Sequence, residues 1–356
     1  MKVGILNVQW LNNQGSVLLA YAIQKKLDEM GIDNDIINFM PYEPQEDEEI
    51  PSAHAEEKAS TVQKIRNYSD FRKRYLRLTK RYVGIANVDE LAYDAYVLGA
   101  DTVWTPIRVH DTEAYMFYYE FCKDQLARKI SWAASIGSDS KEDLDMMTPI
   151  LKERLKNFDY ISVRERETVD YVQQLTDKKV SHAIDPVLML DKEDYRDLTA
   201  GTEKISDRYI YAYLFDHSEG GYQTTNKLSS HTGLPVIANV KDLNQIDYLL
   251  FNNEDDGPAD IIAKVFNADY VITDSYHIMI YAILARKPFI AYSRINTSIR
   301  LRNLLEDLGL TAKFFPNDQD GFEEILQVID YEKVFEKINA WRTSTMSFLR
   351  DALGID

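Results

Sequence analysis

Cysteine is nearly absent from this sequence: Cys122 is the only one among 356 residues. An intrachain disulfide bond and a cysteine-based metal site are therefore excluded. Long apolar runs are also absent, because no stretch approaches the ~18 residues that a membrane span needs. The first residues form neither a charged leader with an apolar core nor a cleavage site. Together these absences predict a cytoplasmic protein without a transmembrane segment.

Positive charge is scarce as well. The chain has 41 Lys and Arg residues against 58 Asp and Glu residues, a formal net charge of −17 at pH 7. Binding to a nucleic-acid backbone depends on clustered Lys and Arg, so no nucleic-acid partner is expected, and neither is an anionic membrane surface. A small anionic substrate is still compatible with this charge if a few cations line its site.

The length favours two domains, since 356 residues exceed the usual size of a single core. Hydrophobic residues make up 45% of the chain and aromatic residues 12%, which is enough for two packed cores. We predict an N-terminal domain over residues 1–200 and a C-terminal domain over 208–330, with a linker at 192–207. The predicted last helix, 331–356, is long enough to pack back on the first domain.

Predicted strands alternate with helical segments in both halves of the chain. This alternation indicates the α/β class, with two Rossmann-like, doubly wound domains. Such sheets bind ligands at the carboxyl ends of their strands, and we expect the ligand cleft between the two domains. Strands are predicted at residues 3–8, 35–39, 95–98, 129–133, 160–163 and 180–183, and in the second half at 209–213, 234–240, 270–273 and 289–292.

Two charged segments follow the second predicted strand. Residues 41–57 are acidic and contain prolines, which is typical of an exposed loop. Residues 64–81 are basic and aromatic, and two interpretations are open for them. They form either an anion-binding helix or a solvated helix that balances the acidic loop, and we favour the second interpretation.

The segment 268–292 is the most informative for function. It predicts a strand at 270–273, a turn at Asp274 and Ser275, and an apolar helix that begins near His277. A strand-to-helix turn lies at the carboxyl edge of a parallel sheet, where α/β folds bind ligands. A histidine there, with a reference pKa of about 6.5, suits proton transfer. The alternative is that the histidine only caps or packs the helix start.

Four polar turns follow predicted strands of the first half. Because the carboxyl ends of parallel strands meet at one edge of a sheet, we expect these turns to cluster and to face the cleft. They contain Asn13, Gly15 and Ser16 in the first turn, Gly99, Asp101 and Trp104 in the second, Ser135 and Gly137 in the third, and Ser162 and Arg164 in the fourth.

The order of these motifs resembles the polysaccharide pyruvyl transferase family. The resemblance extends over residues 3–312, and its seven parts follow one another in the family's order. The parts are the Asn-x-Gly turn with the helix after it, and the segments 93–104, 131–137, 162–165, 185–188, 268–289 and 300–310.

The resemblance implies two Rossmann-like domains in a GT-B-like arrangement with an interdomain cleft. It also implies transfer of pyruvate from phosphoenolpyruvate to two hydroxyls of a surface polysaccharide or its precursor, which gives a cyclic ketal and phosphate. That reaction requires cations or helix N-termini for the donor's anionic groups, a general acid for the enol methylene and a base for the hydroxyls. It requires no metal ion and no cofactor, and its partners are phosphoenolpyruvate and a carbohydrate acceptor.

Carried onto this sequence, the resemblance implies a donor side. His277 is the expected acid/base residue or phosphate contact. Arg164 is expected to bind a donor anion, and the alternative for it is an ion pair with Glu165 or Glu167. Arg300 is expected to supply a second cation from the other domain.

The remaining implied residues complete both sides of the site. Ser275 is expected to contact the donor. Trp104 is expected to stack on a sugar ring of the acceptor. The full acceptor side is expected to contain Asn13, Gly15, Asp101, Trp104 and Ser135.

Two positions depart from the family's pattern, and both bear on the donor. Tyr276 stands where some members have an arginine before the motif histidine, and Ile278 stands where many have a glycine after it. Two other functions therefore stay open: a glycosyltransferase that uses a nucleotide sugar, and a non-catalytic carbohydrate-binding relative. The sequence contains no glycine-rich phosphate loop, although helix N-termini also bind diphosphate unaided.

Overall fold

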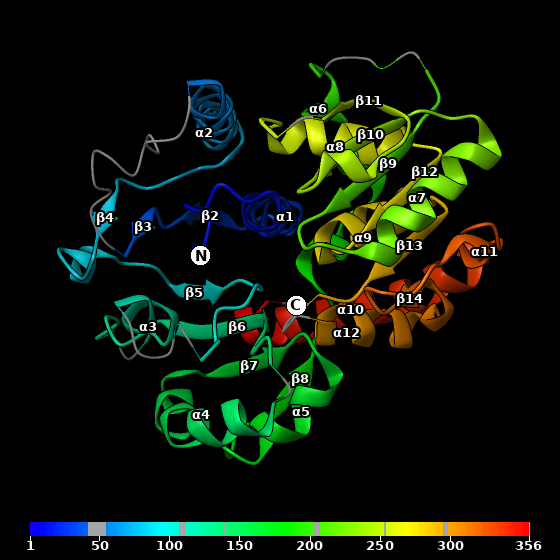
Figure 1. The fold of residues 1–356 in the computed structure, drawn as a ribbon. Coiled ribbons are helices and arrows are strands. Elements are labelled where there is room, and N and C mark those ends of the chain that lie inside the picture. The colour runs from blue at the N-terminus through cyan, green and yellow to red at the C-terminus, as the bar shows by residue number, and fades with distance from the viewer. Residues whose placement is uncertain are drawn as a thin grey trace. The chain divides into compact units, whose positions relative to one another are not determined.

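The computed structural model of the chain describes residues 1–41, 55–106, 108, 112–124, 126–138, 140–202, 205, 207–252, 254–294 and 298–355 (Figure 1). Residues 42–54, most of the predicted acidic loop, lie outside the described residues. Within the described part of the chain, every helix is too short or too polar to cross a membrane.

The chain divides into two compact units, and neither is continuous in the sequence. The first unit contains Met1–Pro51, Tyr68–Leu190 and Asn339–Asp356, and the second contains Ser52–Asn67 and Asp191–Ile338. Each unit has a six-stranded sheet in which all neighbouring strands pair in parallel. The predicted α/β class is therefore confirmed.

The sheet of the first unit has the strand order β2-β1-β5-β6-β7-β8. Most of its strands are short and largely apolar, as expected for parallel strands that are covered on both faces. The strands are β1 (Lys2–Leu6), β2 (Asp33–Ile36), β5 (Ala95–Leu98), β6 (Arg128–Ala134), β7 (Tyr160–Val163) and β8 (Val180–His182).

Helices connect these strands, and a small parallel pair lies outside the main sheet. The pair consists of β3 (Phe39–Met40) and β4 (Tyr82–Val83). The helices of this part of the chain are α1 (Gln14–Glu29), α2 (Ala55–Tyr75), α3 (Thr112–Phe117), α4 (Lys141–Arg154) and α5 (Arg166–Gln173), with 3₁₀ turns η1 (Val88–Glu90), η3 (Leu155–Asn157) and η4 (Pro186–Met189).

The sheet of the second unit has the order β11-β10-β9-β12-β13-β14. Its strands are β9 (Ile210–Leu214), β10 (Val236–Val240), β11 (Leu249–Asn252), β12 (Tyr270–Thr273), β13 (Phe289–Tyr292) and β14 (Phe314–Phe315). Its helices are α7 (Glu219–Thr232), α8 (Pro258–Asn267), α9 (Tyr276–Leu284), α10 (Ser298–Leu308) and α11 (Phe322–Ile325), with 3₁₀ turns η6 (Leu243–Gln245) and η7 (Thr311–Lys313).

The segment predicted as a linker, residues 192–207, is partly helical. It contains η5 (Lys192–Tyr195) and α6 (Arg196–Thr199), and both belong to the second unit. Tyr195 and Leu198 are buried and anchor these turns. The sequence interpretation was wrong here because the charged residues around these two anchors hide the short apolar pattern.

The last helix, α12 (Tyr331–Leu353), is continuous and belongs to both units. Its residues up to Ile338 are part of the second unit, and those after it are part of the first. In the first unit, Arg342 donates from Nε to the Leu188 carbonyl and from Nη2 to the Leu190 carbonyl, both at 2.6 Å. These charged donors hold the helix against the segment that follows β8.

Gly220, in the first turn of α7, should not tolerate alanine. A Cβ atom there would lie 2.0 Å from the backbone carbonyl oxygen of Gln319, which is far inside van der Waals contact. We expect Gly220→Ala to lower the free energy of unfolding by about 1–3 kcal/mol or more, as overpacking does. At Gly201, no atom of the described residues lies within 4 Å of such a Cβ. Equal urea-denaturation midpoints for Gly220→Ala and Gly201→Ala would contradict this packing.

Candidate functional site

The carboxyl edge of the first sheet gathers the four polar turns found in the sequence. The backbone N–H of Ser135 donates to the Asp101 carbonyl (3.0 Å), which joins the turn after β6 to the turn after β5. The N–H of Arg164 donates to the Ala134 carbonyl (3.2 Å), which adds the turn after β7. The hydroxyl of Ser16 donates to Asp101 Oδ2 (2.9 Å), which adds the first turn of α1.

The turn that starts α1 is capped by Asn13. Its Oδ1 accepts from the N–H of Gly15 (2.8 Å), and its backbone is extended, with φ −130° and ψ 127°. Asn13 is exposed, whereas Gly15 is buried. A helix N-terminus keeps unpaired N–H groups, so this turn offers donors to an oxygen-rich ligand. Of these two predicted residues, Asn13 is therefore the one that a ligand in solution can contact directly.

Asn7 lies beside the same turn and was missed from the sequence. Its Nδ2 donates to the Ser16 carbonyl (3.2 Å), and the residue is 1% exposed. Its Oδ1 has no hydrogen-bond partner among the described residues. A buried acceptor without a donor is costly, so a water molecule or a ligand hydroxyl would be stabilised there. The predicted strand 3–8 included Asn7, whereas β1 ends at Leu6.

Part of the basic segment supports the loop between β1 and α1. Arg72 of α2 donates from Nη1 to the carbonyls of Gln9 (3.2 Å) and Leu11 (3.4 Å), and from Nη2 to Asn12 Oδ1 (2.8 Å). Burial lowers the pKa of Arg72 to about 10. Arg72 is therefore neither a solvated charge nor an anion site, because its donors are directed at oxygens of the protein itself.

Arg164 lies in a buried ion network at this edge. Its Nε donates to Glu165 Oε1 (3.1 Å) and its Nη1 to Asp185 Oδ2 (3.0 Å), and these three side chains are at most 3% exposed. Ser135 donates its hydroxyl to the same Glu165 oxygen (2.7 Å). The alternative interpretation, an ion pair with Glu165, is the one the structure shows. A donor anion would have to displace two buried carboxylates from one guanidinium, so Arg164 and Ser135 support the edge instead.

Trp104 is part of the core of the first unit. It is 0% exposed, its ring is stacked on Tyr118 (centroids 6.0 Å apart), and Phe158 meets it edge-on at 5.3 Å. The predicted stacking of Trp104 on a sugar ring is therefore wrong, since aromatic side chains of the protein already cover it. The mistake arose because a tryptophan after a strand was taken to face the ligand.

Asp101 is a strained connector between turns. Its φ is 94°, in the left-handed region that costs a non-glycine residue roughly 1–3 kcal/mol. Its Oδ1 accepts from the N–H of Thr102 (2.8 Å), while Oδ2 takes the hydroxyl of Ser16. Asp101 is 8% exposed, and its carboxylate shapes the turn through these two hydrogen bonds.

The carboxyl edge of the second sheet contains the turn around the motif histidine. Ser275 is the N-cap of α9, but its side chain makes no capping hydrogen bond. His277 lies in the first turn of α9, is 7% exposed, and meets the ring of Tyr276 edge-on at 5.2 Å. The histidine is thus at the predicted edge, at a helix N-terminus that favours anions, and it is not the cap.

Asp274, between β12 and Ser275, has a larger role than the sequence indicated. Its Oδ1 accepts from the N–H of Phe215 (2.8 Å) and its Oδ2 from the N–H of Asp216 (2.7 Å). Burial raises the pKa of Asp274 to about 6, and the two backbone hydrogen bonds oppose that rise. The sequence marked this residue only as a turn, because its partners lie about sixty residues earlier in the chain.

Arg300 of α10 lies against the same turn. Its guanidinium carbon is 5.7 Å from the centroid of the Tyr276 ring, a cation–π contact, and Tyr276 is 5% exposed. The structure therefore brings together Ser275, His277 and Arg300 of the predicted donor side, all in the second unit. Arg164, which was predicted with them, belongs to the first unit.

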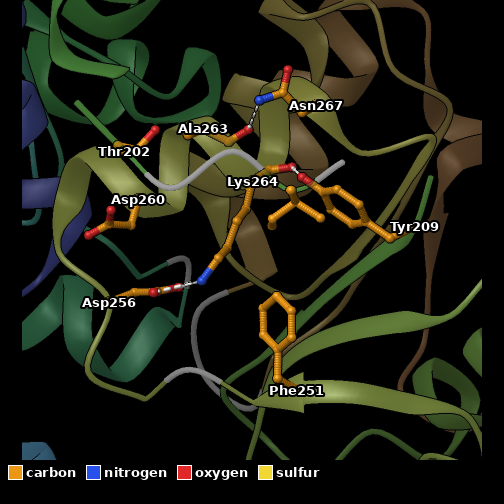
Figure 2. Close-up of a pocket in the computed structure, with 9 residues that line it drawn as sticks. Thr202, Tyr209, Phe251, Asp256, Asp260, Ala263, Lys264 and Asn267 are labelled. Atoms are coloured by element: carbon orange, nitrogen blue, oxygen red, sulfur yellow. Dashed lines mark hydrogen bonds and ion pairs between the residues drawn. The ribbon is translucent and has the colours of Figure 1, made fainter. Parts of the chain in front are cut away.

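The second unit contains a cavity of about 60 Å³. Figure 2 shows residues that line it. Lys264 lines it, and its Nζ donates to both carboxylate oxygens of Asp256 (2.7 and 2.6 Å). The hydroxyl of Tyr209 donates to the Lys264 carbonyl (2.8 Å). Tyr209 precedes β9, so the cavity borders the amino end of that strand. The cavity has room for a few water molecules, and the cation that lines it is already paired with Asp256.

Among the described residues, no three His, Cys, Asp or Glu side chains are grouped in a way that could hold a metal ion. A family model for polysaccharide pyruvyl transferase matches residues 13–296, which is most of the chain.

The chain belongs to the polysaccharide pyruvyl transferase family. A search of curated proteins found no match for this chain. The resemblance seen in the motifs is thereby confirmed, and it includes the Asn13 turn and the His277 turn.

Solved structures with a similar fold include nucleotide-sugar enzymes of the GT-B type. The UDP-GlcNAc 2-epimerase from Neisseria meningitidis, bound to UDP-GlcNAc, is 11% identical, with 99% of this chain and 100% of that chain covered and a TM-score of 0.53. The Staphylococcus aureus protein MnaA, solved with UDP, is 8% identical (100% and 97% covered, TM-score 0.55). The UDP-N-acetylglucosamine 2-epimerase from Rickettsia bellii is 10% identical (99% and 96%, 0.50). At this identity the likeness shows the fold alone.

The two departures from the pyruvyl transferase pattern have different consequences. Ile278 is 0% exposed, so it packs in the core of the second unit and does not line an open site. Tyr276 provides the aromatic face on which Arg300 lies. Tyr276, the residue before the histidine, therefore carries no positive charge itself but contacts the guanidinium of Arg300 from α10.

Arg164→Ala should destabilise this pyruvyl transferase family member strongly. The substitution leaves two buried carboxylates, Glu165 and Asp185, without their cation, which costs about 3–5 kcal/mol. Lys141→Ala in the same unit removes an exposed ion pair with Asp145 and should cost about 1 kcal/mol or less. Urea denaturation of both variants measures the difference. Similar losses would show that Arg164 is not a structural cation.

Asp274→Asn should change how stability depends on pH. The folded-state pKa of Asp274, about 6, lies above its ordinary 3.8, so the folded protein binds this proton more tightly than the unfolded chain. The resulting stability is present below about pH 4 and is lost as the pH rises through about 6. Its size is a few kcal/mol, since one pKa unit corresponds to about 1.4 kcal/mol.

The measurement is urea denaturation of the native protein and of Asp274→Asn from about pH 4 to about pH 8. The free energy of unfolding of the native protein should fall relative to the variant over this range. Asp318→Asn, at an exposed aspartate of the same unit, should show no such trend relative to the native protein. A difference between native protein and Asp274→Asn that stays constant with pH would contradict the raised pKa.

Proposed function

We propose that this family member transfers pyruvate from phosphoenolpyruvate to two hydroxyls of a carbohydrate, giving a cyclic ketal and phosphate. The acceptor in this proposal is a surface polysaccharide or its precursor, and the reaction takes place in the cytoplasm. The observation that carries the proposal is the turn at Ser275, Tyr276 and His277. It combines a helix N-terminus, a histidine and a cation at the carboxyl edge of a parallel sheet.

The proposed reaction requires two proton transfers near that turn. A proton adds to the methylene carbon of phosphoenolpyruvate, and the oxygen of one sugar hydroxyl attacks the adjacent carbon. The bond from that carbon to the phosphate oxygen breaks, and the second hydroxyl takes the place of the phosphate. One hydroxyl proton ends on the new methyl group and the other on phosphate. His277 acts as acid and base in these transfers, as histidine does near neutral pH.

The donor and the acceptor use different units in this proposal. The anionic groups of the donor bind at the N-terminus of α9 near Ser275, with Arg300 as a cation. The hydroxyls of the acceptor bind at the α1 turn through the exposed side chain of Asn13, whose hydrogen bond to Gly15 shapes the turn, close to the unpartnered Oδ1 of Asn7. The buried residues Asp101, Trp104, Ser135 and Arg164 shape the acceptor side from behind.

A thermal-shift titration with phosphoenolpyruvate tests the donor first. Ligand at 100 times its dissociation constant should add about 2.7 kcal/mol of stability to the native protein. UDP and inorganic phosphate are run in parallel. Stabilisation by UDP but not by phosphoenolpyruvate would point to a nucleotide-sugar enzyme, and glycan binding without any donor would point to a non-catalytic relative.

His277→Ala then tests the catalytic assignment. Loss of a general acid/base lowers turnover by about 10²- to 10⁴-fold, so phosphate release with an acceptor glycan should fall by this factor. Binding of phosphoenolpyruvate should change much less, since the α9 N-terminus and Arg300 are unaltered. His231→Ala, at an exposed histidine of the same unit, should leave both unchanged. Full turnover in His277→Ala would show that another group moves the protons.

A further inference from the structure

Hydrogen bonds fix the chain where three neighbouring strands of the second sheet end. β9, β12 and β13 are adjacent in the sheet, with β12 in the middle (Figure 1). Asp274, after β12, accepts the N–H groups of Phe215 and Asp216, which follow β9. The residue before Arg294, Ser293, donates its N–H to the Phe315 carbonyl (2.8 Å), which fixes the chain after β13.

Arg294 lies on the turn that Asp274 holds. Its guanidinium carbon is 5.0 Å from the centroid of the Phe215 ring, and its Nε lies 3.3 Å from Asp216 Oδ2. The stacked ring and the ion pair set the orientation of the guanidinium plane. The Arg294 side chain is 29% exposed, so solvent reaches it although it is held on one face and one edge.

The other edge of this guanidinium is available. Among the described residues, Nη1 and Nη2 of Arg294 form no hydrogen bond and no ion pair. Arg164 in the first unit is the opposite case, since it is buried and shared between two carboxylates. The Nη1 and Nη2 groups of one arginine form a fork that matches two oxygens of a phosphate or carboxylate.

We infer that Arg294 binds the donor's phosphate or carboxylate group through Nη1 and Nη2, with Asp216 and Phe215 as positioning residues. The inference rests on the proposed function, because it assigns the donor of that reaction to this edge. The ligand it requires is a phosphate ester, and phosphoenolpyruvate and a nucleoside diphosphate share that chemistry. Arg294 could not be recognised from its local sequence, because its partner Asp216 is 78 residues earlier in the chain.

Arg294→Gln is the test, with Arg208→Gln as the matched control. Arg208 forms an exposed ion pair with Asp269 (2.7 Å), and these residues precede β9 and β12 at the amino ends of those strands. Each variant therefore removes one arginine charge from the same sheet, at opposite ends. The dissociation constants of phosphoenolpyruvate and UDP are measured by thermal shift for the native protein and both variants, together with the melting temperature without ligand.

We expect Arg294→Gln to weaken binding of the native protein's donor by about 10- to 100-fold, as loss of a charged hydrogen-bond pair does. Arg208→Gln should bind as the native protein does. The melting temperature without ligand should change little, because the guanidinium is partly solvated. Arg294→Lys, which keeps the charge but lacks the fork, should lie between the native protein and Arg294→Gln. It provides the second comparison if the glutamine variant folds poorly.

The outcomes separate this inference from the proposed function. Unchanged phosphoenolpyruvate binding in Arg294→Gln, with binding in the native protein, overturns the role of Arg294 and leaves the proposed function intact. Binding of UDP alone, lost in Arg294→Gln, supports the anion site and overturns phosphoenolpyruvate as the donor. Absence of binding of both probes to the native protein overturns both.

Discussion

Buried carboxylates tie together the ends of the strands in both sheets. Asp101 accepts from the turn after its own strand and from α1, and Asp274 accepts two N–H groups from the turn after β9. A carboxylate makes stronger hydrogen bonds than a neutral carbonyl, but its charge must be kept in a place with little water. The turns at these strand ends are therefore fixed by buried groups of the protein itself.

The arginines at these edges differ in the number of carboxylates that hold them. Two carboxylates and almost complete burial make Arg164 a structural cation. One ion pair and partial exposure leave Arg294 with a free edge, whereas the guanidinium of Arg300 lies over the ring of Tyr276. In a chain with a net charge of −17, an anion site depends on such incompletely paired cations. Burial and pairing together decide which arginines can bind a ligand.

Most of the strands and the family could be predicted from the sequence for a physical reason, although β11 and β14 were not among the predicted strands. Parallel strands are covered on both faces, so they read as short apolar runs followed by polar turns, and the motifs lie in those turns. Helix α4 could not be predicted in this way. It is polar, contains Pro149, and buries only Met147 and Leu151. Tyr195 and Leu198 anchored the supposed linker by the same kind of sparse contact.

The roles of individual side chains were harder to predict, because they depend on partners far along the chain. Trp104 is covered by Phe158, and Arg164 is paired with Asp185, so both are withdrawn from the ligand. Asp274 and Arg294 gain their importance from the turn at Phe215, which the local sequence does not reveal. A motif locates a turn correctly, whereas the direction in which its side chains point is decided by the rest of the fold.

The division of α12 between the two units has a consequence for biosynthesis. Domains usually fold in order as the chain emerges from the ribosome, the N-terminal one first. Here the first unit includes Asn339–Asp356, so it lacks part of its own packing until those residues have been made. The second unit, Ser52–Asn67 and Asp191–Ile338, has all its segments earlier. The unit that begins the chain is thus the last to be completed during translation.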